Sequence, residues 1–232
     1  MLYSKRPHSG GYMKFSFEYL WKCILSGIIY IPVTLKLALI PLFIALILGT
    51  LIALARIFKV PVVEKFFKIF VAVYSGIPLT ITMLIFHLIY LNLFKPGKNG
   101  IMVLAYFTFA IGRTIVVSES IRGAFLAIPK GQYEAAYACG FSTFKTLKTI
   151  IIPQVIPVAL PALTNNTLGS IKNTSIVMVL GIVDVLNGAA IPCADTYSYV
   201  EGYVAAAIIY WAINAVVETL LVRLEKYFAK KR

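Results

Sequence analysis

Charged residues are scarce in this sequence, and acidic residues are the scarcest of them. Only 13% of the 232 residues are charged, with 9 Asp and Glu against 22 Lys and Arg, whereas 60% are hydrophobic. This small number of charged residues cannot cover the surface of a water-soluble globule. The composition therefore indicates an integral membrane protein. The basic residues gather at the ends of apolar segments, where they set membrane orientation and contact anionic lipids, which argues against nucleic-acid binding.

Cysteine and histidine are also few, with 3 Cys and 2 His. Cys23, Cys139 and Cys193 form no C-x-x-C pair and do not cluster with histidine. This spacing argues against a metal site and implies no disulfide framework. Cys139 is expected to be cytoplasmic and reduced, while Cys23 and Cys193 could both face outward without any spacing that pairs them.

Two kinds of functional motif are missing. The chain has no G-x-x-x-x-G-K-[ST] loop for nucleotide phosphates and no soluble segment that could house an ATPase domain. It also shows no nucleophile, base and orienting group in a catalytic pattern, so we expect it not to be an enzyme. The inverted internal repeat that marks many secondary transporters is absent as well.

Five apolar segments are each close to the ~20 residues that a ~30 Å hydrocarbon core requires. They cover residues 31–55, 66–94, 101–121, 155–186 and 204–224. Pro78 is expected to kink or restart the second helix, and the fourth is expected to be broken by Pro157, Pro161 and the polar run 172–175. We therefore predict an all-α, polytopic membrane protein of about five transmembrane helices. Its single transmembrane domain covers residues 13–232, after a candidate N-terminal extension over residues 1–12.

The distribution of Lys and Arg predicts the orientation of the spans. Basic residues concentrate between the first two segments, in the loop after the third segment, and in the C-terminal tail. These regions are expected in the cytoplasm, which puts the N-terminus outside when five spans are counted. Lys5, Arg6, Lys14 and Lys22 argue against an outer N-terminus.

A polar stretch between the third and fourth segments is predicted to form two short helices. Pro129 suits the first turn of a helix over about residues 132–139, and Gly140 suits a left-handed position at its end. Ser142 then offers an N-cap oxygen for a second helix, which Pro153 is expected to close near residue 151.

The spacing of this stretch resembles the signature loop of bacterial ABC importer permeases. In that loop an E-A-A triplet is followed by Gly and then by I-x-L-P, and here Ile152 stands where the pattern has Leu. Residues 118–176 are similar to the polar amino-acid uptake branch of the family, most clearly in the runs IPKGQYEAA and IKNTSI. The run SGIPL at residues 75–79 is similar to the R-G-T-P-L of the same branch.

The resemblance implies that residues 123–153 form a cytoplasmic coupling-helix loop that docks in a cleft of a separate ATPase. The residues carried over to that contact are Glu134, Ala135, Ala136, Gly140, Ser142, Lys145 and Pro153. It further implies a bacterial cytoplasmic membrane protein that works with a second permease copy or a homologous permease. The other implied partners are two ATPase subunits that bind ATP and Mg, and an extracytoplasmic solute-binding protein. No cofactor is expected on this chain.

Polar and ionisable residues within the spans point to a substrate path, since such groups are costly in lipid. The candidates are Arg113, Glu119, Lys172, Asn173, Thr174 and Ser175. Arg113 lies about 12 residues into its segment, and therefore ~18 Å deep at ~1.5 Å per residue. The cationic side chains of Arg113 and Lys172 would bind the α-carboxylate of an amino acid. The Glu119 carboxylate would bind its α-ammonium group. Alternatively these groups satisfy backbone carbonyls or other helices, and Glu119 could pair with Arg122 on the same helical face.

One departure from the branch bears on the substrate. The family often has K-D-T-S where this chain has K-N-T-S, so Asn173 replaces a carboxylate. The loss of an acidic group favours zwitterionic or anionic amino acids over lysine or arginine. An ABC permease for another small solute, and a secondary transporter that works without ATP, are the alternatives.

Overall fold

The protein is described here by a computed structural model covering residues 15–94 and 98–230. Within these ranges every regular element is a helix, and the all-α prediction is confirmed. The long helices are α2 (Ile31–Ile57), α5 (Lys98–Leu126), α8 (Ile152–Asn173) and α10 (Tyr199–Ala229). The shorter helices are α1 (Phe17–Ile28), α3 (Pro61–Ser75), α4 (Leu79–Leu93), α6 (Lys130–Ala138), α7 (Thr143–Thr146), η1 (Leu147–Ile151), η2 (Thr174–Leu180), α9 (Val185–Ala190) and η3 (Ile191–Cys193).

The number of membrane-crossing helices agrees with the prediction. Four helical stretches are long and apolar enough to cross a bilayer, and the pair α3 and α4 adds a fifth when counted as one broken span. The two members of that pair are bent by 101°. Pro78 immediately precedes α4, and its fixed φ with an extended ψ restarts the chain in a new direction. The predicted restart at Pro78 is therefore confirmed.

The fourth segment differs from the prediction, because its prolines do not break it. Pro157 and Pro161 lie inside α8, and Pro153 lies in its first turn instead of closing the preceding helix. A π-helical turn, η1, joins α7 directly to α8, with the Ile152 amide donating to the carbonyl of Leu147. The wider turn changes the hydrogen-bond register just before Pro153, which lets the helix run on.

The polar run at residues 172–175 does interrupt the regular helix, as predicted. α8 ends at Asn173 and continues as a tighter 3₁₀ segment, η2. That segment ends at Gly181, whose φ of 72° is the left-handed conformation that glycine adopts most readily. The chain from Thr143 to Leu180 thus forms one long helical stretch.

Small residues allow α2 and α5 to pack closely. Ala45, Gly49 and Ala53 lie four residues apart on one face of α2, and all three are buried. A Cβ atom added at Gly49 would lie 2.8 Å from Cγ1 of Val117 in α5. Helices in lipid associate through such close approaches of small residues, because apolar burial gives them little net attraction. α8 contacts α2, α5 and α10, and completes the bundle.

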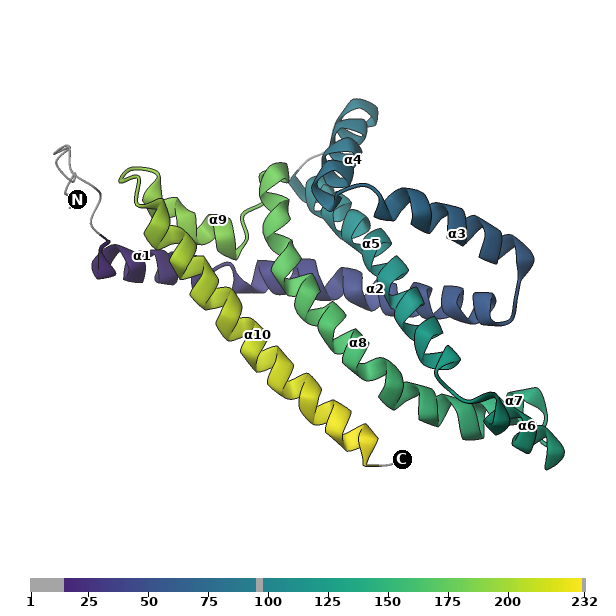
Figure 1. Ribbon diagram of the computed structural model, residues 1–232. Helices are drawn as coiled ribbons and strands as arrows, with labels where there is room; N and C mark the ends of the chain where they lie inside the picture. The colour runs from purple at the N-terminus through teal and green to yellow at the C-terminus, as the bar shows by residue number, and fades with distance from the viewer. Residues whose placement is uncertain (1–14, 95–97, 231–232) are drawn as a thin grey trace.

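Helix α1 is an element that the sequence did not predict. It precedes the first apolar segment and packs against α9 and α10, at the end of the molecule opposite α6 and α7 (Figure 1). Its Ser16 N-cap accepts a hydrogen bond from the Tyr19 amide at 3.5 Å. The candidate extension over residues 1–12 lies outside the described residues.

Candidate coupling site and substrate path

The polar stretch folds into two short helices joined at a glycine, as the sequence predicted. α6 begins at Lys130, directly after Pro129, which supplies the N-cap position. Gly140 has a φ of 77° and turns the chain between α6 and α7. The Oγ of Ser142 accepts a hydrogen bond from the Lys145 amide at 3.4 Å and caps α7. We call α6, α7 and the turn between them the knob (residues 130–146).

Most of the predicted coupling residues are exposed, on the knob or in the first turn of α8 just after it. Six of them are exposed, namely Glu134, Ala135, Gly140, Ser142, Lys145 and Pro153, whereas Ala136 is buried. Lys145 places its Nζ 4.2 Å from the ring centroid of Phe141. The Glu134 carboxylate makes no ion pair within the described residues, so it is available to a partner on the outside of the knob.

A partly buried ring and an exposed hydrogen bond hold the knob against the ends of the long helices. Tyr133 packs against the cluster of buried residues that includes Ile128 and Ile151, and burial raises the pKa of its hydroxyl. Gln154 in α8 donates from Nε2 to Oε1 of Gln132 in α6 at 3.4 Å. The knob is therefore fastened to the first turn of α8.

Near the knob, a cluster of charged side chains joins α2 and α5. Arg56 donates from Nη1 to Oε1 of Glu119 at 2.6 Å. Arg122 donates from Nε and Nη2 to Oε2 of the same carboxylate, at 3.0 and 2.8 Å. The guanidinium of Arg56 also lies over the ring of Phe67 in α3, 4.9 Å from its centroid. The pairing of Glu119 with Arg122 is thus confirmed, whereas the Arg56 contact was missed because it joins residues far apart in the sequence.

Arg113 lies midway along α5 and meets a backbone group of α8. Its Nη2 donates to the carbonyl of Gly169 at 3.1 Å. A Cβ atom at Gly169 would lie 3.7 Å from Nη1 of Arg113, so α8 passes close to the guanidinium. The side chain is partly buried, and the contact satisfies a helix carbonyl, which was the alternative interpretation of this residue.

The four residues of the K-N-T-S run point in different directions. Lys172 is exposed, Asn173 and Ser175 are partly buried, and Thr174 is buried. Ser175 donates from Oγ to the Lys172 carbonyl at 3.2 Å. Thr174 donates to the Ile171 carbonyl at 2.9 Å, and its Oγ1 lies 3.1 Å from the hydroxyl of Tyr210 in α10. Thr174 therefore joins helices inside the bundle.

Asp184, which is buried, and Tyr210, which is partly buried, are polar residues that sequence reasoning did not single out. The Tyr210 hydroxyl donates to Oδ2 of Asp184, and Oδ1 of Asp184 accepts from the Asn187 amide at 3.3 Å and caps α9. Burial raises the pKa of the Asp184 carboxyl, because its environment disfavours the charged form. An acidic residue near the end of the predicted apolar segment 155–186 was the available signal in the sequence.

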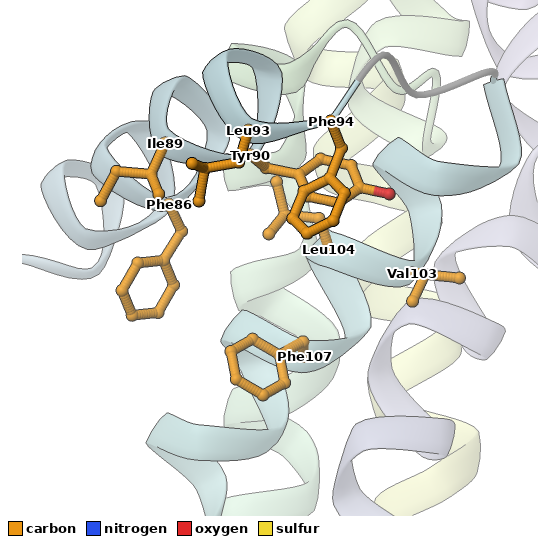
Figure 2. Close-up of a pocket in the computed structure, with 8 residues that line it drawn as sticks. All are labelled: Phe86, Ile89, Tyr90, Leu93, Phe94, Val103, Leu104 and Phe107. Carbon is orange, nitrogen blue, oxygen red and sulfur yellow. The ribbon is translucent and has the colours of Figure 1, made fainter.

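An apolar cavity of about 300 Å³ lies between α4 and α5. Figure 2 shows the eight side chains that line it, all aliphatic or aromatic: Phe86, Ile89, Tyr90, Leu93, Phe94, Val103, Leu104 and Phe107. A site for an amino acid needs polar partners for the carboxylate and the ammonium group. This lining offers a single phenol hydroxyl, so the cavity does not fit such a substrate.

A bundle of membrane-crossing helices with an exposed helical knob at one end defines a multi-pass membrane transport subunit. Residues 45–230 match the family described as "Binding-protein-dependent transport system inner membrane component". The chain belongs to this family, whose members are inner-membrane transport subunits and not enzymes themselves.

Individual relatives extend along most of the chain. It is 32% identical over 218 residues to the L-cystine transport system permease protein TcyB of Bacillus subtilis (strain 168), with 90% of each chain covered. It is 29% identical to the probable amino-acid ABC transporter permease protein PatM of Vibrio harveyi, covering 87% of this chain and 91% of PatM.

Solved structures show the same fold. A chain in the crystal structure of an amino acid ABC transporter with histidines superposes with a TM-score of 0.83 at 28% identity, covering 93% of this chain and 100% of the other. A chain of the inward-facing MetNI methionine ABC transporter superposes with a TM-score of 0.68 at 15% identity, covering 92% and 99%.

Proposed function

We propose that this chain is the permease subunit of an ATP-driven importer that translocates amino acids delivered by an extracytoplasmic solute-binding protein. The observation that carries the proposal is the exposed knob, fastened to the start of a long helical stretch that crosses the bundle. Its relatives include permeases named for amino-acid and L-cystine transport, which supports the substrate class.

The knob serves as the coupling element to partner ATPase subunits, which bind ATP and Mg. Glu134 and Lys145 offer opposite charges on its exposed surface, and Ala135, Gly140 and Ser142 leave room for close approach of a partner. When the ATPase pair closes on ATP, the knob moves with it. The hydrogen bond from Gln154 to Gln132 and the buried Ala136 carry that movement into α8.

The knob and the C-terminus face the cytoplasm, and the N-terminus faces outward. The Lys and Arg distribution supports this orientation, because Arg56, Arg122 and Lys130 gather at the knob end of the bundle around a cavity of about 360 Å³. The same end carries Lys145 and Lys148. The permease works as a pair, with a second copy of this chain or with a similar permease.

The substrate path runs along α5 and the end of α8, past Arg113, Lys172, Asn173 and Ser175. Glu119 belongs to the inner end of this path, but its two guanidinium partners offset its charge and reduce its attraction for an ammonium group. Lys172 is exposed and positively charged. The net positive character of the path favours zwitterionic or anionic amino acids, with the carboxylate directed to the cationic side chains.

The proposal is tested by co-expressing the chain with its neighbouring transport genes and purifying the assembly in mild detergent. ATP hydrolysis is measured with binding protein that carries each amino acid in turn. Stimulation by one loaded binding protein supports both the class and the substrate. If the chain purifies without an ATPase and moves solute down an ion gradient in liposomes, the secondary-transporter alternative holds instead.

A further inference from the structure

Cys23 in α1 and Cys193 in η3 lie side by side although 170 residues separate them. Their Sγ atoms are 3.6 Å apart, and both side chains have 0% of their surface exposed. They belong to one buried cluster with Ala189, Ala205 and Ala206, in which no bulky side chain separates the two sulfurs. Van der Waals contact between two thiols is a geometry from which a small movement can form a bond.

The helices that carry the two cysteines are fastened on both sides of the pair. Before Cys23, the Ser16 amide donates to Oε1 of Glu201 in α10 at 2.9 Å. After it, Ser26 donates from Oγ to the Gly188 carbonyl in α9 at 2.6 Å. These bonds place α1 in a single register against α9 and α10, so Cys23 faces Cys193 in that register.

Glycines make the same interface tight. A Cβ atom at Gly202 in α10 would lie 2.6 Å from Sγ of Cys193. One at Gly27 in α1 would lie 2.7 Å from Cδ1 of Ile209. The helices therefore approach as closely as their backbones allow, and a side chain larger than hydrogen at Gly202 would displace the Cys193 sulfur.

The pair lies on the membrane face opposite the knob. α8 leads away from the knob, and α9 and η3 follow its far end, where α1 also lies (Figure 1). With the knob in the cytoplasm, as in the proposed function on which this step rests, both thiols face the extracytoplasmic side. Disulfides form and persist in that compartment, and the cytoplasm keeps thiols reduced.

We propose that Cys23 and Cys193 form a disulfide bond that joins α1 to the segment between α9 and α10 in the membrane-inserted protein. The oxidant is a disulfide of an extracytoplasmic thiol oxidase. One cysteine thiolate attacks that disulfide and forms a mixed disulfide, and the second cysteine displaces the oxidase sulfur. Two S–H bonds are exchanged for one S–S bond, and the oxidase leaves as its dithiol with both electrons and both protons.

This thiol–disulfide exchange takes place before α1 packs into the bundle. Burial raises the pKa of the Cys23 thiol to about 12 and also raises the pKa of Cys193, so neither thiol ionises readily once enclosed. Exchange requires a thiolate that the oxidase can reach. After packing, the same burial shields the bond from reductants. Because the bond closes a loop of 170 residues, it restricts the unfolded chain strongly.

Cys139 provides an internal reference for the test. It is exposed at the end of α6 in the knob, and it has no second cysteine near it among the described residues. Cells that express the assembly are quenched in acid, the proteins are denatured, and free thiols are tagged with a maleimide polymer that shifts the band on a gel. We expect one tag without reductant and three after reduction.

Single substitutions check which thiols are joined. Cys139→Ser should carry no tag without reductant and two after reduction, whereas Cys23→Ser should carry two in both conditions, because Cys193 has lost its partner. Three tags on the unreduced wild-type protein would overturn the disulfide. A Cys139→Ser variant that carries two tags without reductant would overturn it equally.

A separate labelling distinguishes failure of the disulfide from failure of the proposed orientation. A membrane-impermeant maleimide is applied to intact cells that express Cys23→Ser/Cys193→Ser, which retains Cys139 alone. No labelling until the cells are opened supports the cytoplasmic knob. Labelling from outside would overturn that orientation and, with it, the oxidising location of the pair.

Discussion

Arg56 at the end of α2 donates a hydrogen bond of 2.6 Å to Glu119 in α5, and the two residues are 63 positions apart. The Arg56 side chain is only 12% exposed and that of Glu119 is 36% exposed. Because Arg122 takes the second carboxylate oxygen, one acidic group holds two cations in place. This arrangement fixes the knob end of the two most closely packed helices.

Replacing Glu119 by Gln should destabilise the protein. The variant keeps the shape of the side chain but leaves two guanidinium groups without their charged acceptor, at a cost of about 1 to 3 kcal/mol. The thermal midpoint of the purified assembly would measure the loss. Glu18→Gln is the matched control, because the Glu18–Lys22 pair is 74% and 52% exposed and should contribute less than about 0.5 kcal/mol. An unchanged midpoint with a raised KM for uptake would instead place Glu119 in contact with substrate.

Replacing Glu134 by Gln should weaken coupling without changing the stability of the chain. The carboxylate is exposed, so its loss removes no internal contact, whereas a charged contact with the ATPase would be lost. We expect uptake and ATPase co-purification to fall about tenfold, which corresponds to ~1.4 kcal/mol. Glu218→Gln, also exposed but on α10, should leave both unchanged. Equal behaviour of the two variants would argue against a docking role for Glu134.

Replacing Gly140 by Ala should loosen the knob. With a φ of 77° and open space around it, Gly140 would gain strain but no clash, at about 1 to 2 kcal/mol. Amide hydrogen exchange in α7 should accelerate about 5- to 30-fold, since each 1.4 kcal/mol is a factor of ten. Gly131→Ala offers the control, because Gly131 is helical with nothing within 4 Å. In Gly131→Ala we expect amide hydrogen exchange to be slower or unchanged. Unchanged exchange in Gly140→Ala would contradict the expected backbone strain at position 140.

Replacing Gly49 by Ala should push α2 and α5 apart. The added Cβ would lie 2.8 Å from Cγ1 of Val117 and 3.0 Å from the Thr114 carbonyl, and overpacking of this kind costs about 1 to 3 kcal/mol. A lower thermal midpoint would report the effect. Gly123→Ala in α5 has nothing within 4 Å and should not lower it. Equal thermal midpoints for the two variants would mean that α2 and α5 can move apart without a loss of stability.

The stability of the protein should depend on the protonation of Asp184. Burial raises the pKa of this carboxyl, so the folded protein binds the proton more tightly than the unfolded chain does. The resulting stabilisation is complete below the ordinary pKa of Asp and is lost as the pH rises through the raised pKa. In Asp184→Asn this titration is absent. The thermal midpoint of the wild type should therefore fall relative to that of Asp184→Asn from acidic to neutral pH. A constant difference for Asp184→Asn would contradict the shift.

Structural features that depend on residues close together in the sequence were predictable. The long apolar segments, the restart at Pro78, the left-handed Gly140 and the Ser142 cap each depend on residues within one or two turns of the chain. The pairing of Glu119 with Arg122 is equally local, because residues three apart share one face of a helix. Local rules failed at Pro153, where a π-helical turn changed the register of the hydrogen bonds.

Features that depend on contacts between distant segments were not predictable. α1 has too few residues to span a membrane, and it is held by Glu201 and Gly188, more than 150 positions away. The buried placement of Thr174 likewise depends on Tyr210 in another helix. No spacing rule in a single sequence brings such residues together, since only the packed bundle does so.

The continuous helical stretch from Thr143 to Leu180, which includes a π-helical and a 3₁₀ segment, connects the knob to the opposite end of the bundle. At ~1.5 Å per residue its 38 residues measure roughly 55 Å from the knob to the far end. A tilt of only about 5° at the knob would displace the opposite end by roughly 5 Å, about one helical turn. Helical prolines that leave the stretch in one piece thus let a small rotation at one face of the membrane become a large displacement at the other.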